Sequence, residues 1–154
     1  MKVMMKSVFA GLCVCMASAV LADAPFVKQD DPSSLGLFVW TNEKCPFSED
    51  DVYEMAEKLF KAAKIKPTEN LQLNLTLNVD CMPIVNEKET LLGYSMYTEA
   101  RWGTQLKNGM NVLYEEPDYG FFMIAPESES TEHYLKRIKS SVQEALDDYL
   151  SANS

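Results

Sequence analysis

Cys45 and Cys81 carry the most definite chemistry in this 154-residue chain. Two thiols can form a disulfide, ligate a metal or act as a redox pair. The redox interpretation has little support because the two residues do not form a Cys-x-x-Cys motif. Two of the four cysteines, Cys13 and Cys15, lie in a predicted signal peptide at residues 1–22, so the exported protein would keep only Cys45 and Cys81. In an exported protein such a lone pair is expected to close as a disulfide, with two buried free thiols as the alternative. A bridge closing a loop of about 36 residues would stabilise the fold by about 3 to 4 kcal/mol.

The remaining residue types exclude several classes of site. His133 is the only histidine, so a histidine-based metal site cannot form, and we expect His133 to be an ordinary exposed helix residue. Nucleotide-binding glycine motifs, a calcium loop and a Gly-x-Ser-x-Gly nucleophile elbow are all absent from the sequence. We therefore predict no metal, no cofactor and no nucleophilic triad.

Carboxylates are the one catalytic option that the composition leaves open. Two suitably spaced acids are enough for glycoside hydrolysis, and the chain has 23 acidic residues. Glu99 is the best single candidate because it shares the solvated side of a predicted strand with Tyr97 and Arg101. The favoured interpretation is nevertheless a cross-strand ion pair or hydrogen-bond partner.

The elements that would position these residues follow from hydrophobic periodicity. Alternating apolar residues predict strands, and a 3.6-residue repeat with acidic or serine caps predicts helices. The predicted order is β-α-β-β-β-β-α: strand 35–41, helix 49–64, strands 71–82, 92–102, 112–115 and 119–125, and a final helix that begins after Ser130.

This order predicts an α+β fold of two layers, with a mixed four- to five-stranded sheet and both helices packed on one face. Strands 35–41 and 71–82 should run parallel, which brings Cys45 and Cys81 to one edge of the sheet. The later strands are expected to form an antiparallel meander. Its turns would be a two-residue primed turn at Asn108-Gly109 and a turn at residues 116–118.

The N-terminus has the three parts of a secretory signal peptide. Residues 1–22 combine basic residues, an apolar run and a small-residue exit at Ala22. We predict cleavage after Ala22, a flexible leader at 23–34 and a single α+β domain at 35–154. The protein would be periplasmic, or alternatively secreted, without a membrane span. The formal charge of −9 becomes −11 when Lys2 and Lys6 are removed, which argues against nucleic acid as a partner.

Acidic residues dominate one predicted edge of the sheet. In the meander arrangement, the loops that follow the second and fourth strands would lie beside the start of the first helix. A cationic protein would be steered to that edge. The acids expected to gather there are Glu43, Glu49, Asp50, Asp51, Asp80, Glu87, Glu89, Glu115, Glu116 and Asp118.

The sheet face away from the helices is a second candidate surface. It would carry amides and hydroxyls together with Tyr97, Glu99 and Arg101, which is adaptable contact chemistry. Either Phe38 and Trp40 or Leu37 and Val39 must also point to this face. If exposed, that pair would form an apolar patch of the kind that marks an interaction site.

Three functional hypotheses follow. The first is a non-enzymatic periplasmic binding protein, specifically an inhibitor or immunity protein for a basic envelope-targeting hydrolase. The second is an accessory subunit of a cell-envelope complex that uses the aromatic sheet face. The third is a small secreted hydrolase that uses Glu99 and a loop acid. A protein partner is expected in the first two cases, and the oligomeric state is left open.

Overall fold

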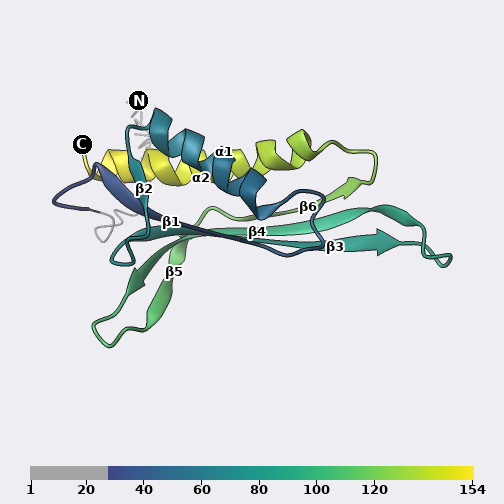
Figure 1. Ribbon diagram of the computed structural model, residues 1–154, viewed down its shortest axis with the longest axis horizontal. Coiled ribbons are helices and arrows are strands. Elements are labelled where there is room, and N and C mark those ends of the chain that lie inside the picture. The colour runs from purple at the N-terminus through teal and green to yellow at the C-terminus, as the bar shows by residue number, and fades with distance from the viewer. Residues whose placement is uncertain (1–27) are drawn as a thin grey trace, which may run out of the picture.

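A computed structural model describes residues 28–154. The expected signal peptide at 1–22 and the first part of the expected leader, 23–27, lie outside the described residues. The described chain forms a six-stranded sheet with two helices on one of its faces, as Figure 1 shows. The elements are β1 Ser34–Thr41, α1 Glu49–Ala62, β2 Lys66–Thr68, β3 Asn74–Val85, β4 Leu91–Gln105, β5 Asn111–Asp118, β6 Phe121–Pro126 and α2 Thr131–Ala152.

The expected α+β class, the mixed sheet and the placement of both helices on one face are confirmed. The sheet order is β2-β1-β3-β4-β5, and β6 also pairs with β4. β1 and β3 are parallel, as the predicted β-α-β unit required. β3 and β4 are antiparallel and form the longest ladder, which runs from Asn74 with Gly103 to Val85 with Leu91.

The short strand β2 was not predicted, and it changes how the chain reaches β3. β2 pairs in parallel with the first three residues of β1 only. The chain then crosses β1 to pair with its other side, where Gly36 donates its backbone N–H to Leu73. A Cβ on Gly36 would lie 2.1 Å from the carbonyl oxygen of Asn70. Glycine is required here because the crossing segment lies directly on β1.

The predicted antiparallel meander is wrong in its last two strands. β5 pairs with residues 101–105 of β4, and β6 pairs with residues 93–98 of the same strand. β5 and β6 therefore follow one another along one side of β4 instead of lying side by side. This is possible because β4 spans 15 residues, long enough to pair with two short strands in succession.

Both predicted turns also differ. The β4–β5 connection closes with Leu106 donating to Met110 and Gly109 donating to Leu106, and only Gly109 in it has a positive φ, 84°. It is a longer loop than a two-residue primed turn, which needs positive φ at both central residues. Residues 116–118 belong to β5, and the chain turns after Asp118, whose carboxylate accepts the backbone N–H of Gly120 at 2.8 Å.

The helices form where their capping residues and apolar stripes predict them. Ser48 and Asp51 make a reciprocal capping box at the start of α1, and Ser130 caps α2 by accepting the backbone N–H of His133. The buried faces of both helices pack on the sheet. The largest fully buried side chains between the layers are Trp102, Tyr134, Tyr149, Phe60 and Leu35.

The start of the described chain contacts the end of α2. Gln29 donates its backbone N–H to Asn153, and the hydroxyl of Tyr149 donates to the carbonyl of Pro32 at 3.3 Å. These contacts place residues 28–33 beside the C-terminus, immediately before β1 begins.

Candidate interaction face of the sheet

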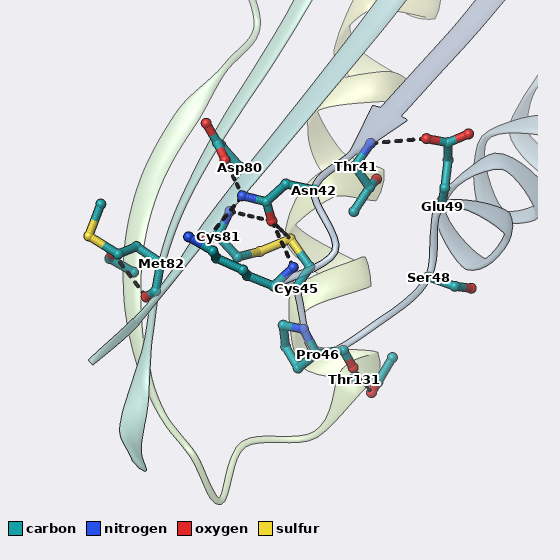
Figure 2. Close-up of a disulfide and its surroundings, with 12 residues drawn as sticks. Thr41, Asn42, Cys45, Pro46, Ser48, Glu49, Asp80, Cys81, Met82 and Thr131 are labelled. Carbon is teal, nitrogen blue, oxygen red and sulfur yellow. Dashed lines mark hydrogen bonds between the residues drawn. A yellow bond between two sulfur atoms is a disulfide. The ribbon is translucent and has the colours of Figure 1, made fainter. Parts of the chain in front are cut away.

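A disulfide joins Cys45, which follows β1, to Cys81 in β3. Their Cα atoms are 4.9 Å apart. Figure 2 shows Asn42 between the two segments: its side-chain amide donates to the carbonyl of Cys81 and accepts the backbone N–H of Cys81 at 3.3 Å. The same amide donates to Asp80. The expected pairing is therefore present, and the side chain of Asn42 supports it with hydrogen bonds across the two segments.

The face of the sheet opposite the helices is built by alternation along four strands. Leu37 and Leu77 point into the core, so Phe38, Trp40 and Asn78 point away from it. The register then aligns outward residues in rows across the sheet. One row contains Trp40, Asn78 and Glu99, the next Asp80, Tyr97 and Phe122, and the next Met82, Ser95 and Ile124.

An ion-pair network occupies the centre of this face. Arg101 Nη2 lies 3.0 Å from a carboxylate oxygen of Glu99 and 3.0 Å from one of Asp118. The hydrogen bond to Asp118, helped by the charges of Asp118 and Glu99, raises the pKa of Arg101 above its ordinary value. Asn78 donates to the second oxygen of Glu99 at 3.4 Å. The ion-pair partner Arg101 lies on the same strand as Glu99, and Asn78 of β3 supplies the cross-strand hydrogen bond.

Exposed apolar side chains lie in the same row as Glu99 and in the next two rows. Tyr97 and Phe122 are direct cross-strand partners, and Ile124 and Met82 lie on either side of Ser95 in the next row. Trp40 lies in the same row as Glu99 and is separated from it by Asn78. All five are substantially exposed: Trp40 by 51%, Tyr97 by 46%, Phe122 by 64%, Ile124 by 65% and Met82 by 68%. We call these five residues the apolar face set.

Sequence reasoning placed Tyr97, Glu99 and Arg101 on this face but missed three members of the apolar face set. Phe122 and Ile124 alternate along a strand that is apolar on both sides, which predicted a fully buried strand. In the structure Met123 packs on the core while Phe122 and Ile124 do not. Met82 sits where the predicted strand 71–82 ended, whereas β3 continues to Val85.

The ten acidic residues expected at one edge do not form one group. Glu49, Asp50 and Asp51 occupy the first turn of α1, and Glu87 and Glu89 lie in the β3–β4 turn. Glu115, Glu116 and Asp118 belong to β5, which pairs with the opposite half of β4. The prediction that these acids gather at one edge is wrong because it assumed that the later strands form a meander. Within the first group, hydrogen bonds from the backbone and the hydroxyl of Ser48 lower the pKa of Asp51.

The described residues contain no group of three or more His, Cys, Asp or Glu side chains that could hold a metal ion. Within residues 28–154, none of the helices has both the length and the apolar character needed to cross a membrane.

Comparison with known proteins gives only distant similarities. No family model and no curated protein matches the sequence. Similar solved structures include a minor lipoprotein from Acinetobacter baumannii, at 15% identity and a TM-score of 0.41 over 79% of this chain and 92% of that one. The PelC dodecamer from Paraburkholderia phytofirmans aligns at 9% identity and a TM-score of 0.43, over 77% and 86% of the two chains. Rare lipoprotein B from Shewanella oneidensis aligns at 9% identity and a TM-score of 0.30, over 75% and 91%. Because every TM-score is below 0.5, none of the three assigns a family or a function to this chain.

Proposed function

We propose that this protein is a non-enzymatic, exported accessory protein of the cell envelope, and that it binds a protein partner with the helix-free face of its sheet. The observation that carries the proposal is the exposure of the apolar face set. Single exposed apolar residues are common, but aromatic and aliphatic side chains that adjoin one another around a polar network are typical of interaction surfaces. The Cys45–Cys81 disulfide fits an oxidising compartment, as export would provide.

The chemistry of the face suits recognition. Aromatic residues and arginine are enriched at the centres of protein interfaces. Here Arg101 is held in one orientation by two carboxylates, and its side chain is 23% exposed, so little conformational freedom is left to lose on binding. Glu99 and Asp118 share this one guanidinium, which favours a structural and binding role for them over hydrolysis.

The inhibitor or immunity hypothesis remains a separate prediction. It depended on acids gathered at one edge, and the structure distributes them over α1, the β3–β4 turn and β5. Salt separates the two modes of binding, because exposed charge pairs are screened at about 0.5 M salt whereas burial of apolar surface is not weakened.

Site-specific photo-cross-linking in the envelope tests the proposal. The photoreactive residue p-benzoylphenylalanine is placed at position 122 on the sheet face, and in a matched variant at position 139 on the exposed side of α2. We expect an adduct with one envelope protein from position 122 only, retained at high salt and lost when Ile124→Ser removes the neighbouring apolar side chain.

Three outcomes would contradict the proposal. Equal cross-linking from positions 122 and 139 would show no preference for this face. An adduct lost at high salt would favour the acidic residues instead. Cross-linking only between copies of the protein itself would replace the accessory role with self-assembly.

A further inference from the structure

A second surface, distinct from the helix-free face, lies along the edge of β1. β2 pairs only with Ser34–Gly36, so the rest of β1, from Leu37 to Thr41, has a paired side facing β3 and an open side. β2 and β3 are the only neighbours of β1 in the described sheet. A central strand thus becomes an edge strand over its second half.

Backbone hydrogen bonds show which groups face the open side. Gly36 and Asn42 donate their N–H groups toward β3, to Leu73 and Val79. Because backbone groups alternate between the two sides of a strand, Val39 and Thr41 direct theirs to the open side. Thr41 confirms this, since its N–H donates to the carboxylate of Glu49 at 3.2 Å, as Figure 2 shows. The N–H and C=O of Val39 have no neighbouring strand there.

A groove follows this open edge. It has a volume of about 530 Å³, and Figure 1 shows α1 above the edge. Its lining includes Tyr53 and Glu49 of α1, Glu69 and Leu71 of the segment that crosses β1, and Phe38 of β1. Exposed strand edges are commonly covered by a helix or a loop, whereas an open groove lies beside this one.

The charged side chains that line the groove indicate which kind of peptide segment would bind there. Glu49 lies at its Thr41 end, and Glu69 follows β2 at the level of Gly36, so one carboxylate stands near each end of the open segment. The described lining residues include no lysine or arginine. An extended segment with basic side chains about four residues apart spans about 13 Å and would place a charge near each carboxylate.

We infer that the open edge of β1 binds an extended, basic peptide segment of a partner protein as an added strand. Backbone hydrogen bonds to Val39 would supply affinity, and the two carboxylates would select lysine or arginine, as in other cases of strand addition. This inference goes beyond the proposed function, because it needs neither Phe122 nor Ile124.

NMR titration of the disulfide-bonded protein tests it. The probe is an end-capped peptide, Thr-Lys-Val-Thr-Val-Lys-Thr, and the matched probe replaces both valines with proline, which keeps the charge but removes strand donors. We expect shift changes centred on residues 37–41 and slower hydrogen exchange at Val39 with the first peptide only.

Two variants complete the test. Val39→Pro removes the open donor without removing a bond to β3, and Glu69→Lys reverses one charge in the groove; each should weaken binding by about tenfold. Glu127→Lys, the same charge change far from the groove, should bind normally. If Val39→Pro fails to fold, Glu69→Lys decides alone. Equal binding of the proline peptide, absence of shifts at residues 37–41, or normal binding by Glu69→Lys would overturn the inference.

Discussion

Trp102 donates its indole N–H to the hydroxyl oxygen of Tyr119 at 3.3 Å, in the interior between β4 and the chain that follows β5. The same hydroxyl donates to Asp148 of α2 at 2.8 Å. The two rings also meet edge to face, with centroids 6.4 Å apart. The corner where β5 gives way to β6 is therefore joined to both layers of the fold at one side chain.

Tyr119→Phe should destabilise the protein by about 1 to 2 kcal/mol, because it leaves the buried indole N–H of Trp102 without its acceptor. Urea unfolding at neutral pH measures this. Tyr97→Phe is the matched control, since its ring is exposed on the sheet face, and its effect should be within about 0.5 kcal/mol. Equal effects of the two variants would contradict the structural role of the Tyr119 hydroxyl.

Stability should also fall at alkaline pH. Burial raises the pKa of Tyr119, Tyr134 and Tyr149 above that of an unfolded tyrosine. The folded state then holds these protons more tightly, so the stabilisation is complete below pH of about 10 and is lost as the pH rises toward the folded pKa values. Each group adds a slope of about 1.4 kcal/mol per pH unit in that range. The free energy of unfolding is measured at steps of about one pH unit between pH 8 and 11.5. It should decline less steeply with pH for Tyr119→Phe than for the unchanged protein. An equal decline in the two proteins would argue against the buried phenol.

Gly36→Ala should be more damaging than Gly109→Ala. A Cβ at position 36 meets the backbone of the crossing segment, 2.1 Å from Asn70 O, whereas at position 109 nothing lies within 4 Å. Gly109→Ala is penalised only by its positive φ of 84°, about 1 to 2 kcal/mol. We expect a loss of about 3 kcal/mol or more for Gly36→Ala, as for severe overpacking. Thermal or urea unfolding of the two variants checks the ranking, and the reverse order would mean that the chain does not cross β1 at this residue.

Removal of the disulfide by the paired change Cys45→Ser and Cys81→Ser should lower the free energy of unfolding by about 3 to 4 kcal/mol. Asn42→Ala keeps the bridge but removes the hydrogen bonds between Asn42 and Cys81, and should cost about 1 to 2 kcal/mol.

Thiol titration of the denatured, unreduced protein without residues 1–22 should find no free thiol, and two free thiols would exclude the bridge.

Phe122→Ser together with Ile124→Ser should change stability by less than about 1 kcal/mol, because both side chains are mostly exposed. Met123→Ser, one residue away on the core side of the same strand, should cost about 2 kcal/mol or more. A large loss from the double change would show that the exposed pair contributes to folding, and the case for a binding face would then weaken. Denaturant unfolding of the three proteins decides this.

Much of the fold could be predicted from local pattern. The alternation around Leu75 and Leu77, the helical stripe of Val52, Ala56 and Phe60, and the caps at Ser48 and Ser130 correspond to observed elements. The cysteine spacing also predicted the observed bridge. These features depend on neighbouring residues or on a single parallel pairing, which the helix between the strands favours.

Strand partners beyond that pairing required the tertiary structure. In the predicted meander β6 would pair with β5, whereas in the observed in-line arrangement β5 and β6 pair with successive parts of β4. Both arrangements bury the same alternate side chains of residues 119–125, so periodicity cannot distinguish them. Only the length of β4 and the buried contacts of Trp102 and Tyr119 select the in-line form. The distribution of the acids depends on that choice, and the open edge at Val39 depends on the short pairing of β2 with β1. The amino-acid sequence by itself thus determined the bridge and the described elements other than β2, whereas contacts between distant residues decided which surfaces remain open for a partner.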